Sequence, residues 1–271
     1  MQTIEKLSIA LRHSSWLEKA DWLWDRVRPY YDKLVALLSH NGLKRNINGT
    51  DLIKVLPQFR GVSEIYEPEV WKHLMAQVKP GDTVADVGAF IGLYTVALAK
   101  RVGSSGTIVA FEPDPKNFTA LKAQVELNGV SKQVDLIQSA VGIQDGSVAF
   151  EADKASESRI SRVLTNSTQM IECVCLDTIF PDRRLDILKI DVEGYEEDVL
   201  KGAVRLLSDS QRSPRIIYIE VHPYAWPAVG TTCESLLGFL DRCQYRVLSL
   251  DGQVVNQINS WGEVVAYKKN V

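Results

Sequence analysis

The stretch Val84-Ala-Asp-Val-Gly-Ala-Phe-Ile-Gly92 decides the fold, because a short apolar strand passes directly into a helix through two glycines. Such a turn brings the first N-H groups of the helix to the carboxyl edge of a parallel sheet, where open α/β folds bind ligands. Gly88 can adopt backbone angles that side chains disfavour, and Gly92 allows the helix to pack close to the strand. We therefore predict a cofactor cradle of bare backbone, formed by Asp86, Gly88, Ala89 and Gly92.

A second signal is Glu112 in the sequence Phe-Glu-Pro. It lies about twenty residues beyond the turn, the spacing at which the second strand of a βαβ unit presents an acid to ribose hydroxyls. Its two oxygens can accept both hydroxyls of an unphosphorylated ribose, with Pro113 beside them. This predicts a cofactor that contains a nucleoside without a 2′-phosphate.

The residues between the two glycines identify the cofactor. Dinucleotide folds place a middle glycine there to admit a pyrophosphate, whereas this chain has Ala89 and Phe90, with Asp86 before the turn. A carboxylate would repel a pyrophosphate but attracts the ammonium and sulfonium groups of S-adenosylmethionine. We predict S-adenosylmethionine; a dinucleotide site and a turn whose glycines serve packing alone are the alternatives.

Composition is typical of a globular protein with a sizeable core: 271 residues, 45% hydrophobic and 24% charged. The net charge of -3 and the absence of a dense Lys/Arg block argue against a nucleic-acid partner. No apolar run approaches the roughly 18 residues of a membrane span, and no signal peptide is evident. The four cysteines lack zinc-site spacing. We expect a cytoplasmic protein without a transmembrane segment.

Alternating patterns organise the chain after residue 60. Repeated strand-helix units predict a parallel sheet with right-handed crossovers. A polar segment, 153-170, is expected to be a loop that either selects the substrate or only connects its neighbours. The expected elements are strands at 83-87, 107-111, 133-138, 147-152 and 215-221 and helices at 92-101 and 115-128.

The first sixty residues form a different segment. A helical apolar stripe runs from about Glu5 to His40, and turns with a short hairpin are expected at 41-60. Trp16, Trp22 and Trp24 favour packing on the main domain, a lid or a homodimer contact, or a membrane-surface contact. We therefore predict an N-terminal helical extension, 1-60, and a cofactor-binding domain, 61-271.

Two further strand ends carry polar side chains. The apolar strand in Leu185-Asp-Ile-Leu-Lys-Ile-Asp-Val-Glu-Gly194 ends in Asp191, at the same sheet edge as Glu112. Glu220 and His222 end the next strand and, being two residues apart, share a face of it. We expect Asp191, Glu220 and His222 to form one constellation.

Taken together, these motifs resemble the FkbM family of S-adenosylmethionine-dependent methyltransferases over about residues 64-268. The resemblance rests on Asp-Val-Gly-Ala-x-x-Gly, Phe-Glu-Pro, Leu-Lys-Ile-Asp-Val-Glu-Gly followed by Val-Leu-Lys-Gly-Ala, and Glu-Val-His. It implies a class I methyltransferase (Rossmann-like) fold: a mostly parallel seven-stranded sheet with helices on both faces and an antiparallel final strand at about 262-268. It also implies methylation of a hydroxyl on a sugar, polyketide or other secondary metabolite. Many members carry Asn where this chain has Phe90.

Several hypotheses about the chemistry follow. His222 is the favoured general base for the acceptor hydroxyl, oriented by Glu220 or Asp191 and without a metal ion. The alternatives are a divalent cation held by Asp191, Glu220 and perhaps His222, a structural histidine, and a non-catalytic subunit that binds S-adenosylmethionine for assembly.

Four other positions complete the predicted cofactor site. Tyr66 and Glu67 precede the fold and either close over the amino-acid end of the cofactor or only pack the entry helix. Ser139 and Ala140 follow the third strand, where this fold meets the adenine.

Overall fold

The computed structural model describes residues 26, 30, 41-151, 159-160 and 168-269, and these form two compact units, Met1–Glu64 and Ile65–Val271. The tryptophans of the predicted N-terminal helical extension lie outside the described residues. In the first unit, β1 (Leu43–Ile47) and β2 (Asp51–Val55) form an antiparallel hairpin, followed by the 3₁₀ helix η1 (Pro57–Phe59). The hairpin expected at 41-60 is therefore confirmed.

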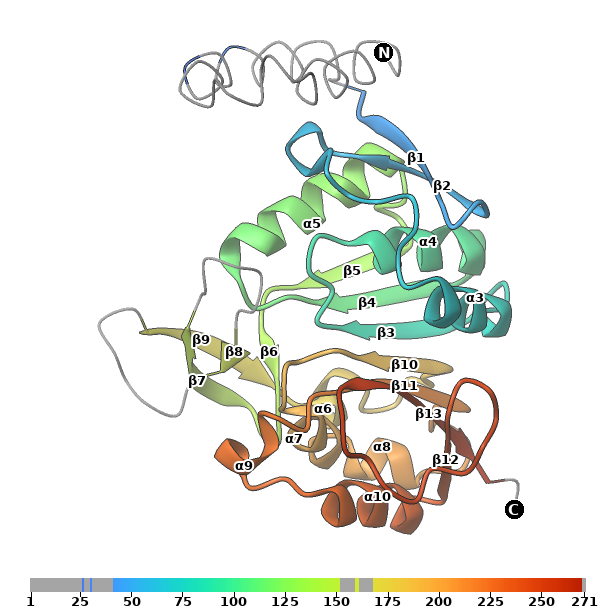
Figure 1. Cartoon of the computed structure of the whole chain (residues 1–271), viewed down its shortest axis with the longest axis vertical. Helices are drawn as coiled ribbons and strands as arrows, with labels where there is room; N and C mark the ends of the chain where they lie inside the picture. The colour runs from blue at the N-terminus through green and yellow to red at the C-terminus, as the bar shows by residue number, and fades with distance from the viewer. Residues whose placement is uncertain (1–25, 27–29, 31–40, 152–158, 161–167, 270–271) are drawn as a thin grey trace, which may run out of the picture. The chain divides into compact units, whose positions relative to one another are not determined.

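The second unit is built on a seven-stranded sheet with the order β12-β13-β11-β10-β3-β4-β5 (Figure 1). Its strands are β3 (Thr83–Val87), β4 (Thr107–Phe111), β5 (Val134–Ile137), β10 (Ile187–Ile190), β11 (Ile216–Val221), β12 (Tyr245–Leu248) and β13 (Gly262–Lys268). β3, β4, β5, β10 and β11 are parallel to one another, and β13 pairs antiparallel with β11 and β12. This confirms the predicted class I methyltransferase fold, with a final strand at the predicted residues.

Helices cover both faces of this sheet. They are α3 (Pro68–Gln77), α4 (Leu93–Val102), α5 (Pro115–Asn128), α6 (Leu176–Ile179), α7 (Glu196–Lys201), α8 (Val204–Ser208), α9 (Trp226–Val229) and α10 (Cys233–Arg242), with a 3₁₀ turn, η2 (Gly103–Ser105). In Figure 1, α4 and α5 lie beside the β3–β5 half of the sheet, and α8 and α10 lie beside the β11–β12 half. Each of these helices within the described ranges is too short or too polar to span a bilayer.

The order of the strands creates the site. From β3 the chain proceeds outward to β4 and β5, whereas β10 and β11 lie on the other side of β3. The crossovers therefore diverge between β3 and β10, and in open α/β sheets the carboxyl ends at such a switch point leave a crevice for ligands. The core beneath is apolar, with buried Val87, Phe111 and Ile190 in one cluster.

A second, four-stranded sheet has the order β6-β9-β7-β8, from β6 (Ala140–Val141), β7 (Gly146–Glu151), β8 (Arg159–Ile160) and β9 (Thr168–Val174). The prediction of a loop over 153-170 is therefore wrong at 159-160 and 168-170. Thr168 to Met170 pair with β7 residue for residue, so backbone hydrogen bonds to a neighbouring strand outweigh the polar composition. The other residues of the predicted loop lie outside those described.

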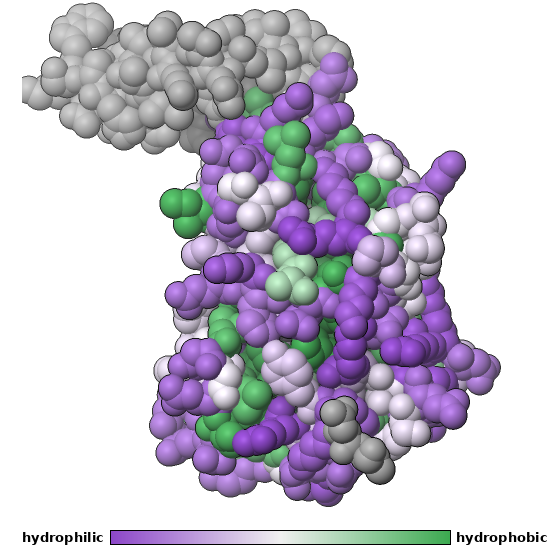
Figure 2. Space-filling view, turned by 90° about the vertical axis from the view of Figure 1, so that its right-hand side faces the viewer, coloured by the Kyte–Doolittle hydropathy of each residue, from purple (hydrophilic) through white to green (hydrophobic). Residues whose placement is uncertain are grey.

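The surface drawn in Figure 2 is mostly hydrophilic, with separate small hydrophobic patches over the second unit. Single exposed apolar side chains are normal on folded proteins.

Candidate active site

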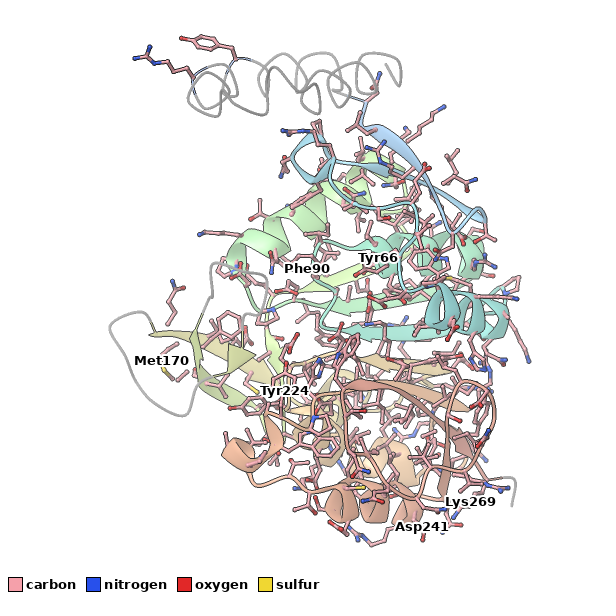
Figure 3. All side chains as sticks on the ribbon, viewed as in Figure 1. Tyr66, Phe90, Met170, Tyr224, Asp241 and Lys269 are labelled. Carbon is pink, nitrogen blue, oxygen red and sulfur yellow. The ribbon has the colours of Figure 1, made fainter. Side chains whose placement is uncertain are left out.

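A cavity of about 240 Å³ opens at the carboxyl ends of β3, β4 and β10. The predicted site residues that line it are Tyr66, Gly88, Glu112, Pro113, Ser139, Ala140 and Asp191. Phe90, Asn117 and Glu193 also line it, without having been predicted as site residues. Figure 3 shows Phe90 and Tyr224 toward the same end of the sheet. Segments far apart in sequence thus meet where the strand order predicted a ligand site.

Glu112 is fixed at the cavity wall by backbone hydrogen bonds. Its Oε2 accepts from the N-H of Phe90 at 2.8 Å, and its Oε1 accepts from the N-H of Asp114 at 2.9 Å. Burial raises the pKa of Glu112 to about 7, although these two hydrogen bonds oppose the rise. Phe90 reaches this position with φ 51°, in the left-handed region. Phe90 stands where many family members carry Asn, and its backbone N-H contacts Glu112 whatever the side chain.

Gly88, the first glycine of the turn after β3, lies so close to the backbone after β10 that no side chain fits there. Gly88 has φ 85°, and a Cβ there would lie 1.8 Å from the carbonyl oxygen of Asp191. The turns after β3 and β10 therefore touch backbone to backbone at the floor of the cavity.

Gly92 plays a different part from the one predicted. A Cβ there would lie 2.6 Å from Leu121 Cδ1 of α5. The expectation that it allows packing of α4 on its strand is wrong: the close approach is between two helices. Gly92 and Ala89 do not line the cavity.

Asp86 lies behind the cavity wall. It is wholly buried, and its Oδ2 accepts from Thr95 Oγ1 of α4 at 2.6 Å, while its Oδ1 has no hydrogen-bond partner among the described residues. Burial raises the pKa of Asp86, opposed by Lys189 and Thr95. Asp86 does not line the cavity, because its side chain turns toward α4; its predicted role in cofactor binding stays a prediction.

Lys189 is a buried cation that the sequence analysis did not single out. Its Nζ lies 3.4 Å from Asp191 Oδ2 and 4.8 Å from the centroid of the Tyr94 ring. Burial alone would lower the pKa of Lys189, but the charges of Asp191 and Asp86 outweigh it and hold the pKa above its usual value. A lysine in an otherwise apolar strand, flanked by strand-end acids, was the available signal.

Tyr66 lines the cavity, whereas the neighbouring Glu67 does not. Glu67 Oε2 accepts from Tyr94 Oη at 2.7 Å, and the Tyr66 ring packs edge-on against Trp71 and Tyr94.

His222 is buried, and its orientation comes from Glu196. Its Nδ1 lies 2.7 Å from Glu196 Oε1, which also accepts from the N-H of Gly194, while Glu196 Oε2 accepts from Trp226 Nε1 at 2.9 Å. The prediction that Glu220 or Asp191 orients His222 is therefore wrong, because the contact comes from the first turn of α7. A carboxylate at Nδ1 favours the tautomer that leaves the Nε2 lone pair open.

Further carboxylates face Nε2. Glu193 Oε2 lies 3.4 Å from His222 Nε2, and Glu220 Oε1 lies 3.8 Å from it. Burial lowers the pKa of His222, but the Glu196 hydrogen bond and the charge of Glu193 outweigh it, and the net shift is upward. Burial, with the charge of Asp191, raises the pKa of Glu220 to about 7. The site can thus accept a proton at Nε2 and stabilise the resulting imidazolium.

A model of the methyltransferase FkbM domain matches residues 86-247 of the chain. The hexuronic acid methyltransferase AglP of Haloferax volcanii is 22% identical over 205 residues, covering 74% of this chain and 80% of that protein. The 31-O-demethyl-FK506 methyltransferase FkbM of Streptomyces tacrolimicus is 25% identical over 183 residues, covering 61% and 69%. The crystal structure of methyltransferase FkbM from Methylobacillus flagellatus KT gives a TM-score of 0.47 at 19% identity, covering 69% of this chain and 43% of that one.

Proposed function

The chain belongs to the FkbM family of methyltransferases, whose methyl donor is S-adenosylmethionine, and we propose that it methylates a hydroxyl oxygen of a small molecule such as a sugar, glycan or polyketide. The observation that carries the proposal is the His222–Glu196 pair, which meets the cavity lining at Glu193. Two relatives support it by their described activities, one on a hexuronic acid and one on 31-O-demethyl-FK506.

The cavity residues fit the donor. Ser139 Oγ is buried and has no hydrogen-bond partner in the described part of the chain, so it suits a ligand heteroatom such as those of adenine. The Glu112 carboxylate suits ribose hydroxyls, and Gly88 keeps the floor free of side chains. Asp191 supplies negative charge at the end toward His222. When bound, S-adenosylmethionine supplies an electrophilic methyl group on a sulfonium.

His222 acts as the general base in this proposal. An aliphatic hydroxyl is a weak nucleophile until its proton is accepted, and a neutral imidazole can accept it at Nε2 near pH 7. Glu196 holds the ring through Nδ1, and Glu193 stabilises the imidazolium from the other side. The upward shift in the pKa of His222 makes the imidazole a stronger base.

One observation favours a second candidate, a divalent cation that assists the transfer. Ligand atoms of Asp191, Glu193 and His222 lie within 4.8 Å of one another, and metal-bound histidines often give their other ring nitrogen to a carboxylate, as His222 does to Glu196. This set has Glu193 where the sequence suggested Glu220. A cation there would polarise the hydroxyl directly and occupy the Nε2 lone pair.

Both candidates are tested by measuring transfer of a labelled methyl group from S-adenosylmethionine to purified glycosides and to cell extracts that contain hydroxylated compounds. His222→Ala should bind S-adenosylmethionine with unchanged affinity by calorimetry and lose turnover by about 10² to 10⁴. His73→Ala is the matched control, because His73 forms its hydrogen bond with Tyr218 outside the site. Retained turnover in His222→Ala excludes the base, and turnover abolished by a chelator and restored by Mg²⁺ or Mn²⁺ favours the cation. Tight donor binding with transfer to none of the acceptors would favour a non-catalytic binding subunit.

A further inference from the structure

Two large aromatic side chains beside His222 remain mostly exposed. Tyr224 and Trp261 each keep 63% of their surface accessible. Aromatic rings carry a large apolar surface, and exposed ones next to a polar site commonly form contact surfaces for ligands. Exposure alone is ordinary, so the contacts of the two rings with the acids around His222 decide whether they face a ligand.

Both rings are held by their polar atoms. Tyr224 Oη donates to Glu193 Oε2 at 2.7 Å, and Trp261 Nε1 donates to Glu220 Oε1 at 2.7 Å. The same two carboxylate oxygens are the ones that face His222 Nε2, at 3.4 and 3.8 Å. Each ring is thus connected to the catalytic nitrogen through a single carboxylate.

The backbone brings the two rings to His222 from different sides. Tyr224 follows β11 directly, and its ring lies edge-on to the His222 ring, with centroids 5.8 Å apart and an interplanar angle of 89°. Trp261 precedes β13 and His222 follows β11, and each lies next to the last pair of the two strands, Gly262 with Val221. The placement follows from the sheet register and the turn after β11.

We propose that Tyr224 and Trp261 form the acceptor subsite and that it binds an uncharged, hydroxylated saturated ring such as a neutral glycoside. This rests on the proposed function. The negative face of an aromatic ring attracts C-H groups polarised by neighbouring oxygens, as on the face of a pyranose. The hydroxyls at the edge of the pyranose donate to the carboxylates of Glu193 and Glu220, whose oxygens each have a second lone pair.

The charges at this subsite select against anionic rings. Asp191, Glu193 and Glu220 surround the approach to His222, and the neighbouring cation, Lys189, is buried against Asp191. A uronate or sugar phosphate would bring a like charge close to these groups, which opposes binding. An entirely apolar ligand would cover the carboxylates without giving them hydrogen bonds, which costs free energy. A neutral polyol ring satisfies both requirements.

Saturation-transfer NMR with methyl β-glucopyranoside and methyl β-glucuronide, on the full chain loaded with S-adenosylhomocysteine, tests the subsite without methyl transfer. The neutral glycoside should bind at least about tenfold more tightly than the glucuronide. Trp261→Leu and Tyr224→Leu should each weaken binding of the neutral glycoside about tenfold, and Tyr224→Phe should lose less because it keeps the ring. Val204→Ala, an exposed apolar side chain on α8, is the control and should bind as wild type.

The outcomes separate the subsite from the proposed function. Glycoside binding that is absent in the wild type, unaffected by both leucine variants, or equally tight for the glucuronide overturns the subsite. Methyl transfer that persists undiminished in both leucine variants leaves the function intact and removes the subsite. Ring-dependent binding without any methyl transfer keeps the subsite and removes the function. Unchanged S-adenosylhomocysteine affinity and melting temperature in the variants show that the fold is retained.

Discussion

Replacing Glu196 by glutamine tests how the protein sets the basicity of His222. Glu196 accepts three hydrogen bonds in a fully buried position, two on Oε1 from His222 and Gly194 and one on Oε2 from Trp226. Glutamine has one acceptor oxygen. If that oxygen keeps His222 and Gly194, the amide nitrogen faces the indole N-H of Trp226. Losing that buried hydrogen bond should lower the free energy of unfolding by about 1 to 3 kcal/mol.

The effect on His222 follows from the lost charge. A hydrogen bond to a charged group contributes about 1.5 to 3 kcal/mol, and one pKa unit corresponds to about 1.4 kcal/mol. Glu196→Gln removes this contribution and should therefore lower the pKa of His222. Because a general base acts when unprotonated, the proposed role of His222 predicts that the rise of kcat/KM with pH moves to lower pH. The plateau should fall about tenfold or more, since the imidazolium formed during transfer loses its partner.

The same substitution changes stability in a pH-dependent way. The pKa of His222 is raised in the folded protein, so its stabilising contribution is complete below its ordinary pKa of 6.5 and is lost as pH rises through the folded value. Glu196→Gln should reduce this pH dependence. Denaturant unfolding at pH 5.5 and at pH 8.5, on either side of about 6.5, measures it.

Two variants separate the charge effect from the damage to packing. Trp226→Phe removes the indole donor, so Glu196→Gln should lower stability less in the Trp226→Phe background than in wild type and should still shift the pH profile. Glu197→Gln changes the neighbouring buried carboxylate, which bonds to Ser235 and Lys201, and should lose stability with no shift. The role of Glu196 in setting the basicity of His222 would be refuted if wild type and Glu196→Gln had the same pH profile of kcat/KM. An equal shift of that profile in Glu197→Gln would refute it as well.

Three further predictions concern the donor side. Gly88→Ala should prevent stable folding or displace Asp191, because its Cβ would meet the Asp191 carbonyl oxygen at 1.8 Å; circular dichroism and thermal melting measure this, and a melting temperature equal to wild type would contradict it. Glu112→Gln should flatten the fall in stability between pH 4.5 and about 7, because burial raises the pKa of Glu112 to about 7 and its proton favours the folded state; an unchanged slope in denaturant unfolding would count against this. Thr95→Val should cost about 1 to 3 kcal/mol of unfolding free energy by removing the hydrogen bond to the buried Asp86, and Thr95→Ser, which keeps the hydroxyl, should lose less in the same measurement.

The strands and helices around the cofactor cradle could be predicted because local patterns determine them. β3, β4 and α5 have the bounds that were predicted for them, 83-87, 107-111 and 115-128. The side-chain direction of Asp86 was less accessible. Because Asp86 is the second-to-last residue of β3, the alternation of a strand turns it toward Thr95 of α4, away from the sheet edge.

The other differences between prediction and structure arise from contacts between segments that are distant in the sequence. Glu196 is 26 residues from His222 and begins a helix, where an acid is ordinarily interpreted as favourable to the helix dipole. Only the parallel pairing of β10 with β11 brings the two together. Likewise, Gly92 contacts α5, and no local pattern specifies which helix will lie there.

The backbone contact between Gly88 and Asp191 has a consequence for how such a protein can diversify. Because a side chain at Gly88 would meet the Asp191 backbone, the positions of the turn after β3 and of Asp191 constrain each other. Tyr224 and Trp261, in contrast, lie outside the strands, in connections whose sequence can vary while the sheet is kept. On the proposed function, substitution of Tyr224 and Trp261 can therefore change the acceptor, while the binding of S-adenosylmethionine stays the same.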